Sequence, residues 1–557
     1  MTILIIVESP SKCKKIQYLL TEIDKSKVFS VVACCGHFRE ISSIDKKTFQ
    51  VKYKYSKGKF KYIQQIRKKI GKNTEIMIAT DNDREGESIG WHLCDVLNLK
   101  IENVKRLRFN EISFQALKNT YENPSTFSKN LLDAAETRQI LDRWIGFHFS
   151  PLLSKFCNQK GLSAGRCQTP TLKLIYDNDK KNKEKTNETI FRIHGTFHKY
   201  NFSLNRPFEK KEDSIDFFKK NLSFQHSFQL PHKVEKKERI PPKPFKTSTI
   251  QQYCSTYWKW SPMVTMKHLQ ELYERGMITY HRTESTELSS SFIKKGLEYI
   301  EKEYGEKYKK KNPNYQPNKT AHEAIRPTDL LKIDEKNKLY TLLRKQTLQS
   351  LMSCAEIEEI QVNIHTPEPE LFFEKIFKKT LFDGFLCLEK KESDFKIPKK
   401  LKPLEKLELK EVPKEESSFY NEGGIIKKLE ELKIGRPSTF ASFISKILFR
   451  NYVEKKDIEK DSFRPFIIWT WELSKEKKDS IQENEIKKEE KPYSEKQYNK
   501  LIINDLGKKV IDYIYHEHSE CFNYEYTSEI EKYLDDIAEG KLEKDTLLKE
   551  IYEKLKK

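Results

Sequence analysis

Short apolar runs that lead directly into charged stretches open the chain. Residues 2–7 (TILIIV) and 75–80 (EIMIAT) are rich in β-branched side chains, which predicts buried strands. Each run is followed by charged residues and then by a helical pattern, so the two units predict a parallel α/β domain. Ligands of such sheets bind beyond the carboxyl ends of the strands, and both charged stretches fall there.

Further along, the pattern changes between helical and strand periods in long blocks. Two strand-like blocks of alternating apolar side chains flank a helical block, so we expect them to pair into one β domain through which the chain passes twice. From residue 420 the chain is expected to be mainly helical, apart from a charged low-complexity linker. The blocks are helical at 130–180 and 249–275, strand-like at 186–235 and 355–412, and linker at 474–494.

Net charge narrows the class of partner. The 557 residues include 104 Lys and Arg against 83 Asp and Glu, a net charge of +21 that is spread along the chain. Such a surface is typical of nucleic-acid binding, with an anionic membrane as the second candidate. The ten cysteines form no CxxC pair, and no apolar run approaches the ~18–20 residues that span a bilayer. We expect no zinc ribbon and an intracellular location, cytoplasmic or nucleoid-associated, with a viral source also open.

The second charged stretch, DNDREGE, contains acids in a pattern that suits a metal ion. Asp81, Asp83 and Glu85 fall on alternate positions after a strand. Their carboxylates can converge on Mg²⁺, which takes few carboxylates together with water and phosphate oxygens. An acidic helix start, favoured by the helix dipole, is the structural alternative. An EF-hand calcium loop is excluded, because its twelfth position requires Glu and His92 stands there.

The first charged stretch, VESPSK, supplies Glu8 and Lys12. On a parallel sheet, both would face the acids of the second stretch. Neighbouring carboxylates raise the pKa of a carboxyl group, so Glu8 can hold a proton near neutral pH. Lys12 can hold a phosphate as a point charge. A surface charge pair is the alternative when this motif is read alone.

Three further motifs place residues that suit phosphate. Arg166 and Gln168 lie among small residues before a helix start, and Arg436 stands at the mouth of another predicted helix; a helix N-terminus favours phosphate. His322 and Arg326 are four residues apart, so the second His of a zinc-protease HExxH motif is absent. No Walker A sequence occurs, which argues against an ATP-driven motor.

The segment GMITYHRTES, residues 276–285, places Arg282 two positions after Tyr280, on the same face of a predicted strand. Read alone, the segment is equally well a strand end with incidental charges. An enzyme that breaks and reseals a strand without ATP must store the bond energy in a covalent link, and Tyr280 is the candidate for that link.

Together the motifs resemble the type IA DNA topoisomerases, closer to the bacterial topoisomerase I branch than to topoisomerase III. They follow the family order and cover nearly the whole chain. The matching motifs are VESPSK (7–12), GHFRE (36–40), ATDNDREGESIGWHL (79–93), FNEIS (109–113), RQILDRWIGF (138–147), LSAGRCQTPTL (162–172), PPKPFKTSTIQQ (241–252), LYERGMITYHRTES (272–285), AHEAIRPT (321–328), IGRPSTFA (434–441) and YEYTSEIEKYLDDIAEG (524–540).

The resemblance implies a toroid that combines a Toprim α/β domain, helical domains and a β-rich arch. The implied domains are a Toprim catalytic domain at 1–120 with an inserted segment at about 40–72, a helical DNA-binding domain at 121–182 and 419–557, the arch at 183–245 and 334–418, and a helical domain carrying the tyrosine at 246–333.

For the activity, the resemblance implies an isomerase that relaxes negatively supercoiled DNA without ATP. Tyr280 would attack a phosphodiester of single-stranded DNA and form a 5′-phosphotyrosyl bond. Arg282 and Lys12 would hold the phosphate, and Glu8 would protonate the leaving 3′-oxygen. A monomer that acts on single-stranded and negatively supercoiled duplex DNA is expected.

The resemblance also implies which residues bind metal and DNA. Mg²⁺, or another divalent cation, would be held by Asp81, Asp83 and Glu85, and no zinc is expected. The implied DNA contacts are Arg166, Gln168, His322, Arg326 and Arg436.

Three residues depart from the family pattern. Glu284 stands where the family usually has Asp, Cys167 replaces a small apolar residue, and His281 replaces a larger apolar residue or Met. The zinc-ribbon tail common in bacterial topoisomerase I is missing, so we expect weak or distributive relaxation.

Two rival hypotheses can be separated from this interpretation by experiment. A Toprim nuclease or primase would share Glu8 and the acids of the second charged stretch but would not need Tyr280 or Arg282. A basic single-strand-binding protein would use its aromatic side chains to stack on bases.

Overall fold

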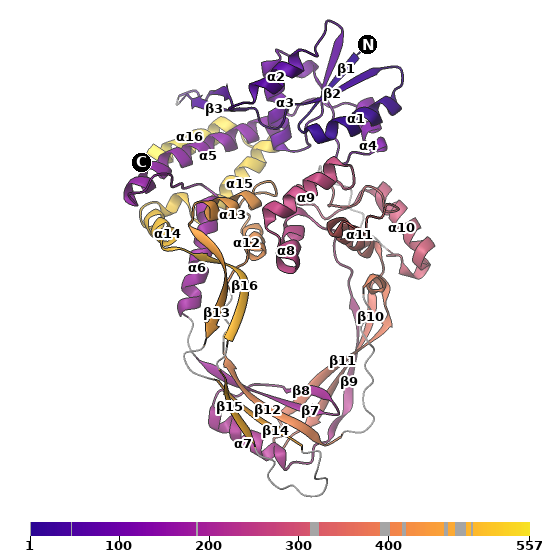
Figure 1. Ribbon diagram of the computed structural model, residues 1–557, viewed down its shortest axis with the longest axis vertical. Coiled ribbons are helices and arrows are strands. Elements are labelled where there is room, and N and C mark those ends of the chain that lie inside the picture. Colours follow the sequence, from indigo (N-terminus) through magenta and orange to yellow (C-terminus); the bar gives the residue numbers. More distant parts are fainter. Residues whose placement is uncertain are drawn as a thin grey trace.

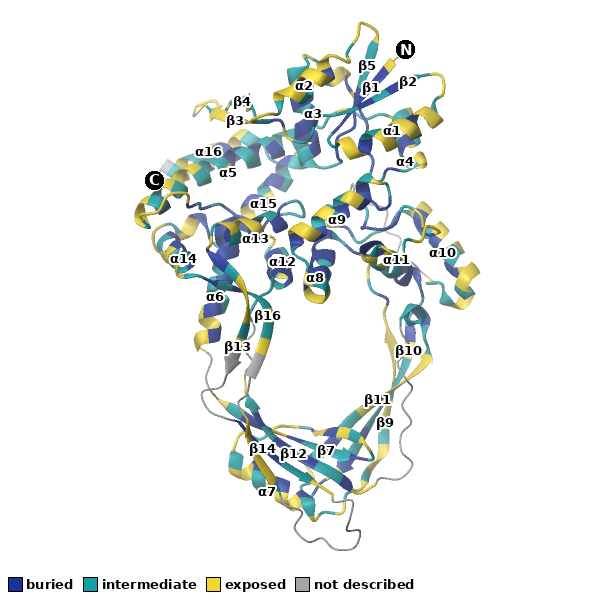
Figure 2. Cartoon of the chain, in the orientation of Figure 1, coloured by how far each residue is buried: buried dark blue, intermediate teal, exposed yellow. Residues whose placement is uncertain are grey.

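The chain closes into a ring around a central opening (Figure 1). An α/β region with the N-terminus lies at one end of the ring, a β-rich arch lies at the other, and helices and ribbons join them (Figures 1 and 2). The computed structural model describes residues 2–45, 47–184, 188–311, 322–389, 402–414, 419–461, 466–473, 486–491 and 494–556.

The N-terminal region is built on a parallel sheet in the order β2-β1-β5-β6. Alternate side chains of β1 (Thr2–Val7) enter two separate cores, one on each face of the sheet, which is why the run is apolar throughout. Ile6 at the end of β1 pairs with Ile78 at the end of β5, so both charged stretches begin at the same edge. The elements here are α1 (Pro10–Ile23), β2 (Val28–Ala33), β3 (Arg39–Ile44), β4 (Val51–Tyr55), α2 (Phe60–Arg67), β5 (Thr74–Ile78), α3 (Arg84–Val96), η1 (Ile101–Asn103), β6 (Lys105–Arg106) and α4 (Phe114–Glu122).

The core on one face of this sheet continues into the helical region that carries Tyr280. Ile3 and Ile5 of β1 belong to the same buried cluster as Leu269, Tyr273 and Tyr280. A shared apolar core therefore fixes the tyrosine segment against the sheet. This helical region contains α8 (Thr247–Trp258), α9 (Pro262–Glu274), α10 (Ser290–Tyr304), η2 (Glu306–Tyr308) and α11 (Lys338–Leu351).

The arch is one sheet of eight strands within the described residues, in the order β15-β14-β12-β7-β8-β11-β10-β9. Its core is rich in Phe, and α7 (Lys211–Leu222) packs against it through Phe217 and Phe218. The strands are β7 (Thr189–Phe197), β8 (Tyr200–Leu204), β9 (Phe228–Arg239), β10 (Ala355–His365), β11 (Phe372–Phe382), β12 (Leu404–Pro413), β14 (Phe466–Glu472) and β15 (Lys487–Lys491), with η3 (Gly384–Leu388) after β11.

The remaining helices join the arch to the N-terminal region on the other side of the ring. Two cores hold them together, one around α6, α13 and α14 and one around α5, α15 and α16. The elements are α5 (Lys129–Phe156), α6 (Gln168–Glu184), α12 (Glu422–Glu431), α13 (Phe440–Phe449), β13 (Val453–Asp461), β16 (Ser494–Ile503), α14 (Asp505–Glu517), η4 (Ser519–Cys521), α15 (Tyr524–Ala538) and α16 (Lys544–Lys556).

The chain after residue 420 contains the expected helices, α12 to α16, but the expectation of two passes through the β domain was wrong. β14 and β15 form a third pass into the arch, and β13 and β16 form a separate two-stranded ribbon. β14 joins because alternate positions of FIIWTWE place Ile467 and Trp469 in the core of the arch, with Trp471 packed against it. Within the predicted linker, residues 486–491 are mostly strand, whereas 474–485 and 492–493 lie outside the described residues. The predicted domain limits stay predictions.

The strand predicted around Tyr280 was also wrong. Residues 276–285 are extended but form only an isolated bridge, between Ile278 and Pro327. The backbone groups that they bond to belong to loops, so no regular series of strand hydrogen bonds forms.

Candidate active site

The tyrosine segment is held by backbone hydrogen bonds to two other loops. The N–H of Tyr280 donates to the carbonyl of Asn110 at 2.7 Å, and the N–H of Thr279 donates to the carbonyl of Arg326 at 2.9 Å. Gly276 opens the segment at φ +65°, and a Cβ there would lie 2.5 Å from the carbonyl oxygen of Ile112, so this position requires glycine. The nucleophile candidate is therefore placed by rigid backbone contacts.

Tyr280 points into the acidic edge of the sheet. Its hydroxyl donates to Oδ2 of Asp83 at 2.6 Å, and its side chain is only 1% exposed. Burial and the charges of Asp83 and Asp81 raise the pKa of Tyr280 well above its usual value. The residue is thus a protonated phenol without DNA, and the proton has an acceptor already in place.

Arg282 spans the two acids that follow Asp81. Its guanidinium donates to Glu85 at 2.8 Å and lies 3.6 Å from Asp83. Burial opposes the charge, but Tyr280, Asp83 and Glu85 raise the pKa of Arg282 above its ordinary value. A fixed cation therefore stands beside the tyrosine hydroxyl.

Lys12 is a second buried cation at the same edge. It is 1% exposed and forms an ion pair with Asp81. Its Nζ also lies 4.9 Å from the ring centroid of Tyr273, and the hydroxyl of Tyr273 reaches Asp81 at 3.4 Å. Burial alone would lower the pKa of Lys12, but the charges of Asp81 and Glu8 raise it, so the ammonium stays charged.

Glu8 is an acid whose proton affinity is raised by its surroundings. Its Oε1 accepts a hydrogen bond from the backbone N–H of Asp81 at 2.8 Å. Burial and the charge of Asp81 raise the pKa of Glu8 to about 8, although Lys12 acts in the opposite direction. At neutral pH this raised pKa favours the protonated form of Glu8.

The acidic loop, Asp81 to Asp83 with the first residues of α3, has little conformational freedom because its backbone turns directly into the helix. Asp83 caps the helix, since its Oδ1 accepts from the N–H of Gly86 at 2.7 Å. A side chain on Gly86 would clash with the backbone of Asp81. The turn is therefore both the start of a helix and a cluster of acids, the two interpretations made from the sequence.

The three predicted metal ligands do not converge on one point. Asp83 and Glu85 share Arg282, whereas Asp81 is turned to Lys12. In the part of the chain that the structure describes, no group of three or more His, Cys, Asp and Glu side chains is arranged for a metal ion. Two carboxylates nevertheless suffice for Mg²⁺ when phosphate and water complete its shell, so Asp83 and Glu85 fit the ion.

The residues predicted to contact DNA fall into two groups. Arg166 is 2% exposed and lies between Asp142 and Glu531, at 3.1 and 2.6 Å. Arg326 is 4% exposed and pairs with Glu111 at 2.9 Å and Glu323 at 2.8 Å. Both arginines are held in buried ion pairs in the structure without DNA. Their contact with DNA stays a prediction.

His322 and Arg436 also lie beside the tyrosine segment. The ring of His322 is 5.8 Å from that of Tyr280, and Arg436 reaches Glu284 at 3.8 Å. Gln168 lies at the start of α6 and bonds to Ser163. Arg436 precedes rather than opens its helix, because α13 begins at Phe440.

Glu284, the acid that departs from the family pattern, is the first member of a series of ion pairs. Glu284 pairs with Arg436, Arg436 pairs with Asp535 of α15, and Asp535 pairs with Arg84 at 2.5 Å. Arg84 lies between Asp83 and Glu85 in the acidic loop. Three distant segments are thus linked beside the tyrosine, and these contacts must separate if the tyrosine segment moves away from the sheet.

Three residues at the site were not predicted from the sequence. Tyr273 contacts Asp81 and Lys12, Glu111 holds Arg326, and His37 lies near Glu85 and Arg282, where burial lowers its pKa. All three stand inside motifs that were recognised, LYERGMITYHRTES, FNEIS and GHFRE. Their position inside these motifs could have indicated that they are important, but it did not indicate which side chains they contact.

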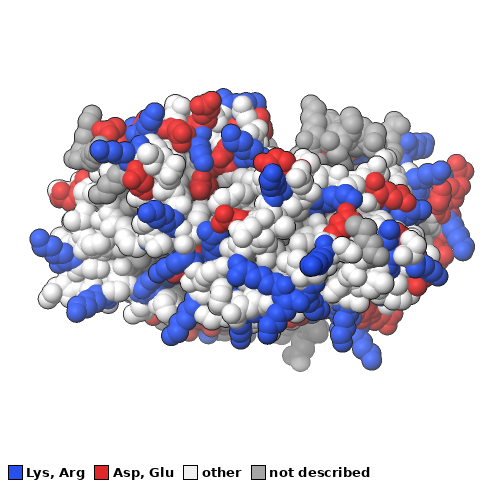
Figure 3. All heavy atoms as spheres, turned by 90° about the horizontal axis from the view of Figure 1, so that it is seen from above, with Lys and Arg blue, Asp and Glu red and all other residues white. Residues whose placement is uncertain are grey.

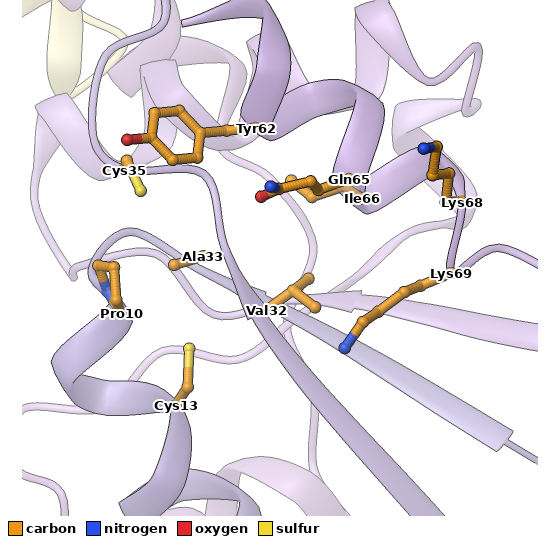
Figure 4. Close-up of a pocket in the computed structure, with 10 residues that line it drawn as sticks. All are labelled: Pro10, Cys13, Val32, Ala33, Cys35, Tyr62, Gln65, Ile66, Lys68 and Lys69. Atoms are coloured by element: carbon orange, nitrogen blue, oxygen red, sulfur yellow. The ribbon is translucent and has the colours of Figure 1, made fainter.

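A cavity of about 460 Å³ lies beside the start of α1, the helix that carries Lys12 (Figure 4). Pro10 and Cys13 of α1, Val32 of β2, and Tyr62 and Lys69 beside it line its wall. No candidate catalytic residue lines it, so we do not assign the reaction to this cavity.

Comparisons with known proteins agree on one class, an enzyme in which a Toprim domain is joined to a DNA topoisomerase region. The family model described as "Toprim domain" matches residues 3–112, and that described as "DNA topoisomerase" matches residues 126–465. DNA topoisomerase 1 of Aquifex aeolicus (strain VF5) is 31% identical over 582 aligned positions, which cover 99% of this chain and 98% of that protein. Full-length topoisomerase I from Thermotoga maritima superposes with a TM-score of 0.81 at 28% identity and covers 99% of this chain and 89% of that one.

The chain belongs to the type IA DNA topoisomerases. It is an isomerase, and the activity of this family is the relaxation of supercoiled DNA through transient cleavage of one strand. Members of the family need no ATP, and Toprim domains typically bind Mg²⁺. Within the described residues, no helix is long and apolar enough to cross a membrane.

Proposed function

We propose that Tyr280 is the nucleophile that carries the family activity in this chain. The observation that supports it best is the 2.6 Å hydrogen bond from its hydroxyl to Asp83, at the edge where Glu8 and Lys12 also lie. The phenolic oxygen attacks the phosphorus of a single-stranded phosphodiester, a 5′-phosphotyrosyl bond forms, and the 3′-oxygen leaves. The raised pKa of Tyr280 keeps the phenol protonated until attack. The proton then passes to Asp83, because the hydroxyl already donates its hydrogen bond to that carboxylate.

Two cations stabilise the charge that develops in this step. Arg282 lies beside the tyrosine hydroxyl and can bind the scissile phosphate with its planar fork. Lys12 supplies a second positive charge from the first turn of α1. Preorganised charges in a buried site are effective because they need no reorganisation during the reaction.

Glu8 completes the step as a general acid. Its raised pKa lets it donate a proton to the leaving 3′-oxygen, and as a carboxylate it removes that proton when the strand is resealed. The same residue thereby serves both directions of the reaction.

The pKa of Glu8 predicts how cleavage depends on pH. Glu8 is protonated below about pH 8 and ionised above it, so the cleavage rate should be flat below this value and fall about tenfold per pH unit above it. Glu8→Gln should remove this fall and lower cleavage roughly 10²-fold. Single-turnover cleavage of a labelled oligonucleotide between pH 6 and 10 measures both, with exposed Glu102→Gln as the control. An unchanged profile in Glu8→Gln would remove Glu8 from this role.

Asp83 and Glu85 would hold Mg²⁺ in this proposal, with Asp81 nearby. When bound, the ion positions the DNA phosphates for resealing. Arg282 then serves the phosphate rather than the two carboxylates, so the ion and the phosphate would replace its present partners.

Removal of divalent cations should separate binding from turnover. With EDTA, plasmid relaxation should stop, whereas single-stranded oligonucleotide binding should change less than about threefold, because binding depends mainly on phosphate contacts with Lys and Arg. Relaxation that persists in EDTA and is insensitive to added Mg²⁺ would contradict the assignment of these acids.

We further propose single-stranded and negatively supercoiled duplex DNA as the substrates of a monomeric enzyme. The net charge of +21 supports a phosphate-binding surface. Lys and Arg gather along one edge of the face seen in Figure 3, although Asp and Glu are interspersed over it. The Toprim domain, the tyrosine region and the arch would act as the separate bodies that open and close.

A plasmid assay distinguishes this function from its rivals. Negatively supercoiled plasmid with Mg²⁺ should become a ladder of relaxed topoisomers with intact strands. A Toprim nuclease would leave nicked or linear DNA, and a single-strand-binding protein would leave linking number unchanged. Either of those results with the full chain would overturn the proposed function.

A further inference from the structure

The tip of the hairpin formed by α8 and α9 carries an exposed aromatic ring that the mechanism does not use. Tyr257 is 68% exposed, although it lies in a helix whose first residues are buried. The N–H of Thr247, at the start of α8, donates at 3.1 Å to the carbonyl of Thr283, which lies in the tyrosine segment, residues 276–285. A helix of 12 residues spans about 18 Å, so Tyr257 lies well away from Tyr280.

The location of this tip is set by the direction of α8. Since the start of α8 is tied to the active site, its other end points away from the N-terminal region. Figures 1 and 2 show α8 at the border of the central opening, with its exposed end toward that opening. DNA held inside the ring would therefore meet this end of the helix.

The aromatic residues next to Tyr257 pack against other side chains, so their presence needs no ligand. Trp258 and Trp260 pack edge to face at 5.1 Å, and Nζ of Lys338 lies 4.5 and 4.4 Å from their ring centroids. Tyr253 supports Tyr257 from one side, with ring centroids 4.6 Å apart. These contacts fix the tip and leave Tyr257 exposed.

The charge around the tip favours an anionic partner. Residues 256–268 contain Lys259 and Lys267 but no Asp or Glu, and both lysines are exposed. Met263 and Val264 add apolar surface, at 50% and 40% exposure. An aromatic ring with adjacent lysines is the combination that binds single-stranded nucleic acid, because bases stack on the ring and phosphates pair with the cations.

We infer that Tyr257 and Lys259 form a second site for single-stranded DNA at the border of the central opening, separate from the strand at Tyr280. This inference rests on the proposed function, since a strand that passes through the ring would use such a site. Duplex DNA is the weaker candidate, because its bases are stacked and offer no free face to Tyr257.

Substitution of Tyr257 should separate strand passage from cleavage. Tyr257→Ala should slow plasmid relaxation about fivefold to tenfold, because one base–aromatic stack is lost, whereas cleavage of a short oligonucleotide that covers only the Tyr280 site should stay within about twofold of wild type. Tyr257→Phe should restore relaxation. Tyr18→Ala is the matched control, since Tyr18 is 64% exposed on α1 and should behave as wild type.

A binding measurement tests the site independently of activity. A long single-stranded oligonucleotide should bind Tyr257→Ala about fivefold more weakly than wild type, and Lys259→Glu should weaken binding similarly, while duplex binding by Tyr257→Ala stays unchanged. The inference is overturned if single-strand binding is unaltered, which would favour a protein partner for this surface, or if oligonucleotide cleavage falls as much as relaxation, which would make the tip a structural support. Failure of the wild-type chain to relax plasmid would instead count against the proposed function, and the binding result would still decide the site.

Discussion

Tyr280→Phe is expected to lower plasmid relaxation by at least about 10⁴-fold, because removal of a covalent nucleophile leaves only binding and electrostatic contributions. The change removes one oxygen from a fully buried side chain and keeps the ring that packs against Tyr273 at 5.2 Å. The fold should therefore be retained. Relaxation by the variant and the protein–DNA adduct trapped with denaturant are the two measurements.

The loss should be specific to the chemical step. Tyr280→Phe should bind single-stranded oligonucleotide within about threefold of wild type, because the hydroxyl hydrogen-bonds to Asp83 and the phosphate contacts come from Lys and Arg. Tyr273→Phe serves as a matched control, since it removes a second buried hydroxyl that reaches the same acidic edge at 3.4 Å from Asp81. It should retain adduct formation, with a much smaller decrease in rate. Relaxation by Tyr280→Phe at the wild-type rate would remove Tyr280 from the reaction.

Arg282→Ala is expected to lower cleavage about 10²- to 10³-fold, the usual result of losing one preorganised donor to a developing charge. The variant also leaves Asp83 and Glu85 without the cation they share, which would repel the incoming phosphate. Arg282→Lys should lose about tenfold, because it keeps the charge but not the planar fork. Single-turnover oligonucleotide cleavage measures these effects.

The neighbouring arginine provides a control for Arg282. Arg84 belongs to the same acidic loop but points to Asp535 at 2.5 Å. Arg84→Ala should therefore affect cleavage far less than Arg282→Ala. If both variants lost the same activity, the effect would arise from the charge of the loop as a whole, and the specific role of Arg282 would be contradicted.

The parts of the fold that apolar patterns determine could be predicted from the sequence. β1 and β5 are read directly from TILIIV and EIMIAT, because both faces of their sheet are covered. β13 and β16 could not be read, because a two-stranded ribbon held by backbone pairing needs no apolar period and VEKKDIEKD has none. In the third pass into the arch, β15 was missed for the related reason that it is KKEEK, a charged strand at the edge of the sheet. The apolar pattern of β14, FIIWTWE, was a strand signal that could have been read.

Most members of the candidate site were expected from the sequence, but Tyr273, Glu111 and His37 were not, and neither were the pairings between side chains. Glu8 and the acids of DNDREGE follow neighbouring parallel strands, so their proximity follows from topology. The bond from Tyr280 to Asp83 joins residues 197 positions apart, and only the shared core that carries the tyrosine segment onto the sheet creates it. The division of the acids between Lys12 and Arg282 likewise depends on side-chain directions that no sequence spacing contains.

The most direct test of the central claim is to locate the covalent bond to DNA. The full chain would be incubated with a single-stranded oligonucleotide, denatured to trap the adduct and digested, and the modified peptide would be sequenced by mass spectrometry. The account predicts a 5′-phosphate attached to Tyr280 in the peptide containing GMITYHR, with a free 3′-hydroxyl on the other fragment. An adduct on another residue, or one that joins the protein to a 3′-phosphate, would contradict it.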